Sequence, residues 1–447
     1  MRSNCPKAGK EHVISASERV RALLKNALVR NILGLSGIQI TTILIPLATI
    51  PYLTRVLQPS SWGLLAFAQA FGGYLLGVID YGFPLSATRE IARFQDDREK
   101  IGEILSDVLG AKVFLAAICL VVSLTALRWV PYFREHPVLL WSSLCWATCQ
   151  GFNMLWYFQG IERVGPYAKL DVTTKVLAAI GIFVFVRQPQ DDWKVLALQA
   201  FMALISAGVA MGLAYSKTPF AFPRPASAWR ALRMGWSMFF FRSSVSLYTV
   251  GNAFILGLFA PTTIVGYYAA AEKLSRAALS ALNPVSQAVY PRVVRLISST
   301  PLEAASLVKR TLGLLGFAGG CIGMLFFAFA PWIVRIVLGK NYYPVIPMLE
   351  VLALLPLFIS LSCVLGLLWM LPLGMDRSFN TVILTAGILN LGLALLLAPA
   401  FGGQGMAWAV VIAELYVVSA MYYWLRRKKK DPFQFSKPIK EHDHGKI

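Results

Sequence analysis

The chain has 447 residues, of which 57% are hydrophobic and 14% are charged, and its formal net charge is +20. A soluble protein is usually about one quarter charged, so this composition excludes an ordinary soluble domain and indicates a membrane protein with many spans. The segments between the apolar stretches are short and leave no room for a separate catalytic domain, so we do not expect an enzyme.

Apolar stretches of about 20 residues, the length that crosses a bilayer as a helix, occur twelve times along the chain. The fifth and eighth have the weakest apolar signal. We therefore predict an all-α polytopic membrane protein with about twelve transmembrane helices. The stretches lie at 31–53, 62–83, 109–130, 138–158, 166–186, 193–215, 235–258, 264–290, 311–331, 344–371, 378–399 and 404–425.

The distribution of lysine and arginine orients these helices. The two tails and alternate loops carry 29 of the 42 basic residues, whereas the opposite side carries 7, counting Arg128 and Lys194 at the outer ends of their stretches. Short basic loops stay in the cytoplasm, so we expect both termini to be cytoplasmic. Much of the net charge is then a topology signal, and no nucleic-acid partner is expected. The six cysteines show no CxxC spacing, so we expect neither a metal site nor a cofactor.

The second and eighth stretches form an internal repeat. GLLAFAQ at 63–69 aligns with GYYAAAE at 266–272, which matches Gly63 with Gly266 and Gln69 with Glu272. An offset of six spans preserves orientation, so the two halves are expected to be parallel copies around a central cavity. The predicted organisation is a cytoplasmic tail (1–30), an N-terminal six-helix lobe (31–215), a cytoplasmic loop (216–234), a C-terminal six-helix lobe (235–425) and a basic tail (426–447).

The second stretch has a polar face at helical spacing, formed by Gln69, Gly73, Gly77 and Asp80. An ionisable residue at this depth indicates a functional site, whereas the two glycines are equally consistent with close helix packing. In the third stretch, we expect Lys112 to extend to the cytoplasmic surface.

Charged residues also begin the fifth stretch, where Lys169 is expected to reach the same surface. Lys175 lies deeper and follows Asp171 by four residues, so an intrahelical pair explains both. In the seventh stretch Arg242 shares a face with Ser246 and Thr249. Hydroxyls along that face favour a cavity, and extension to the interface is the alternative.

The eighth stretch carries Glu272, Lys273 and Arg276 within a length that spans a bilayer. A charge at this depth costs about 2.5–3.5 kcal/mol at least, so such residues normally face a bundle interior or a water-filled cavity. A polar stripe about 22 Å long is expected on one continuous helix, with Glu272 and Arg276 as a same-face pair. It consists of Glu272, Arg276, Ser280, Asn283 and Gln287.

The twelfth stretch has Glu414 near its middle, where we expect the carboxyl group to be protonated or paired with a cation from another helix. The cavity therefore has a positive bias, from Arg242, Lys273, Arg276 and Lys175, with Gln69, Asn283 and Gln287 as polar wall residues. Arginine and lysine suit phosphate oxygens, so an anionic substrate with a phosphate or pyrophosphate head is predicted.

Two long segments, 31–93 and 247–293, resemble bacterial Wzx-like polysaccharide flippases. These are the polysaccharide-transporter branch of the multidrug/oligosaccharidyl-lipid/polysaccharide exporter superfamily. The resemblance covers essentially the whole chain in span number and loop lengths. Its most specific pieces are DYGF at 80–83, ATR at 87–89, GYY at 266–268 and AEKL at 271–274.

This resemblance implies a flippase that moves undecaprenyl-diphosphate-linked oligosaccharide from the inner to the outer leaflet of the bacterial plasma membrane, with two lobes that rock to alternate access. The implied partners are the lipid-linked glycan, membrane lipids, and a polysaccharide polymerase with chain-length components. The product is left open among O-antigen, capsule, exopolysaccharide and teichoic-type polymers.

Many relatives carry an acidic residue in the seventh span, where this chain has Gly251 and Asn252. Coupling to a proton or sodium gradient is therefore open, and the remaining candidate residues for it are Glu272, Glu414 and Asp80. The alternative functions are a cation-coupled multidrug exporter of the same superfamily, a flippase for peptidoglycan precursors, and a membrane polymerase or glycosyltransferase. A net basic cavity disfavours a cation exporter, and the short loops disfavour the enzymes.

Overall fold

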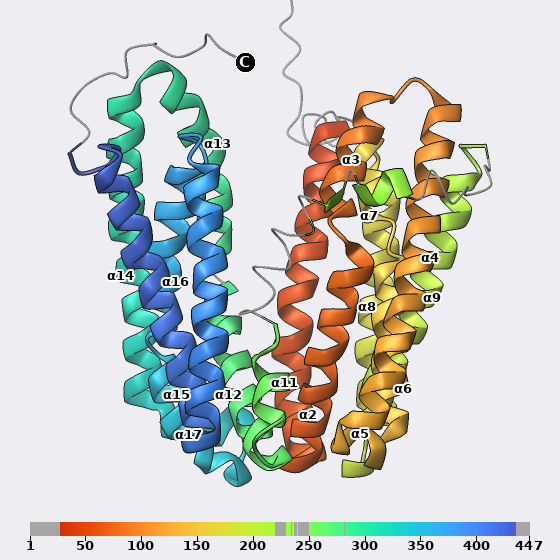
Figure 1. Ribbon diagram of the computed structural model, residues 1–447, viewed down its shortest axis with the longest axis vertical. Helices are drawn as coiled ribbons and strands as arrows, with labels where there is room; N and C mark the ends of the chain where they lie inside the picture. The colour runs from red at the N-terminus through yellow and green to blue at the C-terminus, as the bar shows by residue number, and fades with distance from the viewer. Residues whose placement is uncertain are drawn as a thin grey trace, which may run out of the picture.

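The computed structural model describes residues 27–219, 229–233, 235, 236, 239, 250–280 and 282–434 (Figure 1). All regular secondary structure in this part of the chain is helical. Six helical stretches are long and apolar enough to cross a membrane by length and composition. They are Gly34–Arg93, Arg98–Trp129, Pro189–Tyr215, Pro301–Leu338, Lys340–Met370 and Asp376–Arg427. The predicted all-α polytopic membrane fold is thus confirmed.

The N-terminal lobe consists of one long helical element and shorter ones that pack beside it. Its elements are α2 (Ala27–Asp80), α3 (Phe83–Arg93), α4 (Arg98–Trp129), α5 (Pro131–Glu135), α6 (Pro137–Gly151), α7 (Leu155–Gly160), α8 (Val164–Phe185), the 3-10 turn η1 (Pro189–Asp191) and α9 (Asp192–Tyr215). α2 contains the first two predicted spans. They are separated at Gln58, where the chain reverses and where φ of 59° and ψ of 170° are not helical.

The C-terminal lobe also contains an element made of two helices that meet at a reversal, and this element is the last of the lobe. Its elements are α11 (Asn252–Gly257), α12 (Thr262–Ser280), α13 (Asn283–Ser299), α14 (Pro301–Ile333), η2 (Val334–Leu338), η3 (Lys340–Val345), α15 (Ile346–Leu352), α16 (Leu355–Ser362), η4 (Cys363–Met370) and α17 (Asp376–Arg427). α17 contains the last two predicted spans, which meet at Gly402 with a φ of 57°. Only glycine adopts such a backbone conformation without strain.

Several predicted spans are interrupted in the structure. The tenth, expected over 344–371, divides between α15, which ends at Leu352, and α16, which begins at Leu355. The eighth was expected to be one helix over 264–290, but α12 ends at Ser280 and α13 begins at Asn283. Pro284 accounts for this break, because proline has no N–H to donate and disfavours helical backbone at the residue before it. The fourth, expected over 138–158, divides into α6 and α7 between Gly151 and Leu155.

The helices form two groups that converge at one end of the molecule and separate at the other end, where α3 and α13 lie (Figure 1). The hydrophobic cores follow the same division. One core combines both groups, joining Trp62 and Phe67 of α2 to Leu256, Tyr268 and Leu349. The other two cores each lie within a single group. The predicted lobe boundaries between 215 and 235 stay a prediction, because part of this segment lies outside the described residues.

The two lobes meet most closely where α2 crosses α12. A Cβ atom on Gly63 would overlap the carbonyl oxygen of Thr262, and one on Gly266 would overlap the carbonyl oxygen of Pro59. The hydroxyl groups of Ser60 and Thr262 lie 2.9 Å apart at the same crossing. The internal repeat matches Gly63 with Gly266. These two equivalent glycines, one from each lobe, therefore pack against each other.

This crossing makes the stability of the protein sensitive to a single methyl group. We expect Gly63→Ala to lower the free energy of unfolding by about 3 kcal/mol, the upper end of the usual cost of overpacking, because the added carbon meets backbone that cannot rotate away. Thermal unfolding of the detergent-purified protein measures the effect. Gly208→Ala in α9 is the matched control, since nothing lies within 4 Å of its Cβ position. Equal melting temperatures for the two variants would contradict the close crossing.

Candidate functional site

A cavity of about 780 Å³ lies between the lobes. Its walls come from α2, with contributions from α7, α8 and α9, on one side and from α12 and α13 on the other. Five of the residues that were predicted to bind substrate line it together, namely Gln69, Lys273, Arg276, Asn283 and Gln287. Within the described part of the chain, Lys273 and Arg276 are its only charged lining residues. The predicted positive bias of the cavity is thus present in its geometry.

Lys273 bridges the two lobes. Its Nζ donates a hydrogen bond of 2.7 Å to Oε1 of Gln69, and it lies 4.4 Å from the ring centre of Trp62. Over the described residues, no carboxylate comes within 4.0 Å of this ammonium group. A lysine has three donors, so the contact with Gln69 leaves donors that can bind a ligand in the cavity.

Arg276 forms the predicted pair with Glu272. Its two nitrogens Nη2 and Nε lie 2.9 and 3.2 Å from Oε1 of Glu272. The arginine side chain is 41% exposed and the glutamate 13%, so the guanidinium group faces the cavity while its partner lies behind it. Arg276 therefore lines the cavity as a cation whose charge Glu272 offsets in part.

A chain of buried amides supports Glu272 from behind. Asn252 of α11 donates to Oε1 of Glu272 at 3.3 Å, and Asn390 of α17 donates to Oδ1 of Asn252 at 3.1 Å. Both asparagines are fully buried. Glu414 is also buried in α17 and lies near enough to Arg276 for electrostatic attraction, but within the described residues it forms no ion pair shorter than 4.0 Å, so the predicted cation partner stays a prediction. Asn390 could not be identified from the sequence, because an asparagine in an apolar stretch carries no charge.

Asp80 lies outside the lining of this cavity and pairs with Lys112. The lysine side chain is 0% exposed, its Nζ lies 3.5 Å from Oδ1 of Asp80, and it also donates to the carbonyl oxygen of Gly151. The prediction that Lys112 reaches the cytoplasmic surface is therefore wrong. α4 begins at Arg98, eleven residues earlier than the predicted span, so Lys112 lies about 20 Å along the helix rather than near its start.

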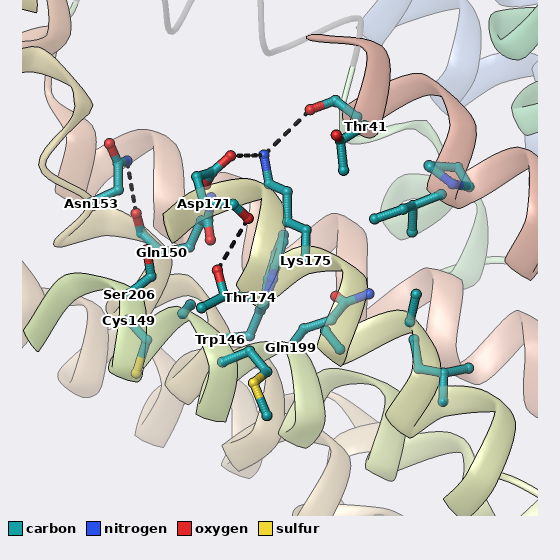
Figure 2. Close-up of a pocket in the computed structure, with 18 of the residues that line it drawn as sticks. Thr41, Trp146, Cys149, Gln150, Asn153, Asp171, Thr174, Lys175, Gln199 and Ser206 are labelled. Atoms are coloured by element: carbon teal, nitrogen blue, oxygen red, sulfur yellow. Dashed lines mark hydrogen bonds and ion pairs between the residues drawn. The ribbon is translucent and has the colours of Figure 1, made fainter. Parts of the chain in front are cut away.

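Lys175 lines a second cavity of about 300 Å³ within the N-terminal lobe (Figure 2). The predicted pair with Asp171 is confirmed, since the two charged groups lie 2.8 Å apart. Lys175 also contacts the hydroxyl group of Thr42 at 3.3 Å. It does not join Lys273 and Arg276 in the central cavity. Arg242, with Ser246 and Thr249, lies outside the described residues.

No three His, Cys, Asp or Glu side chains converge within the residues that the structure covers, so the geometry offers no group of metal ligands there. The charged groups of the site act instead through hydrogen bonds and electrostatic attraction. Ammonium and guanidinium groups that face a cavity at membrane depth are suited to bind an anion.

The sequence matches a family model described as polysaccharide biosynthesis protein over residues 28–297. It is 29% identical over 410 residues to a protein of Escherichia coli (strain K12) named "Putative O-antigen transporter", covering 91% of this chain and 98% of that protein. A Shigella dysenteriae protein of the same name is 29% identical over 401 residues, covering 88% and 98%.

Solved structures of membrane transporters share the fold. The chain superposes on a lipid II flippase, MurJ, in an inward closed conformation with a TM-score of 0.66 and 13% identity, covering 88% of this chain and 87% of that one. An inward-facing multidrug resistance transporter of the MATE family gives a TM-score of 0.61 at 14% identity, covering 88% and 100%. At these identities the likeness concerns the fold.

The pair of Lys112 and Asp80 is expected to act in stability. Asp80→Ala leaves a fully buried ammonium group without its carboxylate, so we expect a loss of about 3–5 kcal/mol in the free energy of unfolding. The double variant Asp80→Asn with Lys112→Met removes both charges and should recover most of this loss. Thermal unfolding of the three proteins checks the expectation. An Asp80→Ala protein as stable as the wild type would show that the pair is not buried.

Proposed function

The chain belongs to the polysaccharide biosynthesis protein family, and on this premise we propose that it is a flippase for lipid-linked oligosaccharides. Its substrate is undecaprenyl-diphosphate-linked glycan, which it moves from the cytoplasmic to the periplasmic leaflet of the bacterial plasma membrane. The names of its relatives in Escherichia coli and Shigella support a role in transport rather than in catalysis. The observation that carries the proposal is the central cavity, whose charged lining is basic.

A diphosphate group fits this cavity by charge and by size. Lys273 has no carboxylate partner in the described residues, and the guanidinium group of Arg276 lines the cavity beside it, so the two cations suit phosphate oxygens. The volume of 780 Å³ lies within the range of about 300–1,000 Å³ that is usual for small-molecule sites. We propose that the polyprenyl chain remains in the lipid, which is its preferred solvent.

We propose that the lobes alternate access by moving about the end at which they are joined. The shared core lies at the end that carries the loops at 54–61 and 259–263, which the positive-inside rule places on the periplasmic side. We infer that this conformation is closed to the periplasm and open to the cytoplasm, with both termini cytoplasmic. Opening the other way would separate the lobes at Ser60 and Thr262 and where Tyr132 donates to the carbonyl oxygen of Ala260.

The residues for ion coupling remain a proposal. Glu272 and Glu414 flank Arg276, so a proton or sodium ion at either carboxylate would change the charge that Arg276 presents to the substrate. Asp80 is a weaker candidate, because Lys112 already offsets its charge away from the cavity.

Replacing the two basic cavity residues tests the proposal. We expect Lys273→Ala and Arg276→Ala each to reduce surface polysaccharide about tenfold or more, the effect of losing a hydrogen bond to a charged group. The lipid-linked oligosaccharide should accumulate in the cells at the same time. The assay complements a strain in which the gene is deleted and measures both quantities.

Arg377→Ala is the matched control, since Arg377 is exposed and does not line the cavity. Variants are compared at equal amounts of protein in the membrane. Full export by both the Lys273→Ala and the Arg276→Ala proteins would contradict the proposal.

A further inference from the structure

The second cavity, which we call the side cavity, lies inside the N-terminal lobe, between the first half of α2 and helices α6, α8 and α9 (Figure 2). Its volume of about 300 Å³ is at the lower end of the range of about 300–1,000 Å³ for ligand sites. The two cavities adjoin, because they share the lining residues Thr42, Ile45, Pro46, Ile182 and Gln199.

The wall of the side cavity carries no net charge. Its charged lining residues in the described chain are Asp171 and Lys175, which neutralise each other at 2.8 Å. Figure 2 shows the side chains of Asp171 and Lys175 facing each other at the cavity. The hydroxyl group of Thr42 lies 3.3 Å from Nζ of Lys175. An ion would have to compete with this pair, so the site favours a ligand that is polar but neutral.

The polar groups of the side cavity suit a ligand with many hydroxyl groups. Gln150 and Ser206 line it from α6 and α9, and Gln199 lines it where it joins the central cavity. None of these three side chains has a hydrogen-bond partner within the residues that the structure describes. An amide offers two donors and an acceptor, and leaving them unmade away from water is costly.

The aromatic residues of the same wall add a second feature of sugar sites. The rings of Trp146 and Tyr167 line the side cavity beside the amides. A pyranose ring has a C–H face that packs on an aromatic ring and hydroxyl edges that bond to amides, and this wall offers both kinds of contact. A lipid chain would leave the amides unsatisfied, and a bare phosphate would find no free cation.

We propose that the side cavity binds neutral sugar residues of the lipid-linked glycan while Lys273 and Arg276 hold the diphosphate. The inference rests on the proposed flippase function and divides recognition between the lobes. The N-terminal lobe selects the glycan, and the C-terminal lobe binds the group that every substrate of this kind shares. The shared lining at Thr42 and Gln199 gives the first sugars a path from one cavity to the other.

Binding of three probes to the purified protein tests this division. The probes are the lipid-linked oligosaccharide extracted from a strain that lacks the gene, the free oligosaccharide released from it by mild acid, and undecaprenyl diphosphate. We expect the double variant Gln150→Leu with Ser206→Ala to bind the free oligosaccharide about tenfold more weakly, the effect of one or two neutral hydrogen bonds. Its affinity for undecaprenyl diphosphate should be unchanged. Lys273→Ala should show the reverse pattern.

Gln404→Leu is the matched control, because Gln404 is exposed in the other lobe and lines neither cavity. Melting temperatures verify that each variant is folded. If the double variant is not, Gln150→Asn replaces it, since this change withdraws the amide by one methylene group.

The outcomes separate the two proposals. Wild-type affinity of the double variant for the free oligosaccharide, or no binding of that probe to the wild type, overturns the side cavity as a sugar site. Loss of free-oligosaccharide binding in the double variant, together with no binding of undecaprenyl diphosphate to the wild type, supports the sugar site and contradicts the proposed function.

Discussion

The backbones of α2 and α12 touch where neither helix carries a side chain, and the rest of the site depends on this contact. Helices in a membrane gain little from hydrophobic burial against each other, so close packing of small residues holds them together. At the crossing of Gly63 and Gly266 the two lobes share one core. About two helical turns further along, Lys273 reaches Gln69 and lies over Trp62. The crossing thus sets both the joint between the lobes and the position of the cation in the cavity.

Symmetry of the backbone contrasts with asymmetry of the charges. Gly63 and Gly266 occupy equivalent places, yet the matched positions further along α2 and α12 carry Gln69 in one lobe and Glu272 in the other. The N-terminal lobe offers neutral amides and an internally neutralised ion pair to its cavities, whereas the C-terminal lobe offers Lys273 and Arg276. The proposed substrate has the same division, because its diphosphate is charged, like the C-terminal wall, and its glycan is neutral, like the N-terminal wall.

Contacts within one helix could be predicted from the sequence, and contacts between helices could not. Spacing of four residues predicted the pairs of Glu272 with Arg276 and of Asp171 with Lys175, because both partners lie on one helix face. Nothing in the spacing joins Lys112 to Asp80 or Asn252 to Asn390, whose partners come from different helices. Pro284 is a sequence signal for the break between α12 and α13. The eighth span was nevertheless predicted as one helix, because apolar residues continue on both sides of this proline.

The central claim is that this protein moves a lipid-linked glycan across the bilayer, and a translocation assay tests it most directly. Purified protein is reconstituted into liposomes that contain the lipid-linked oligosaccharide from the deletion strain, and a membrane-impermeant reagent modifies the glycan on the outer surface. We expect about half of the glycan to react in protein-free liposomes and nearly all of it to react when the protein is present. A reactive fraction that stays at one half with the protein would contradict the account.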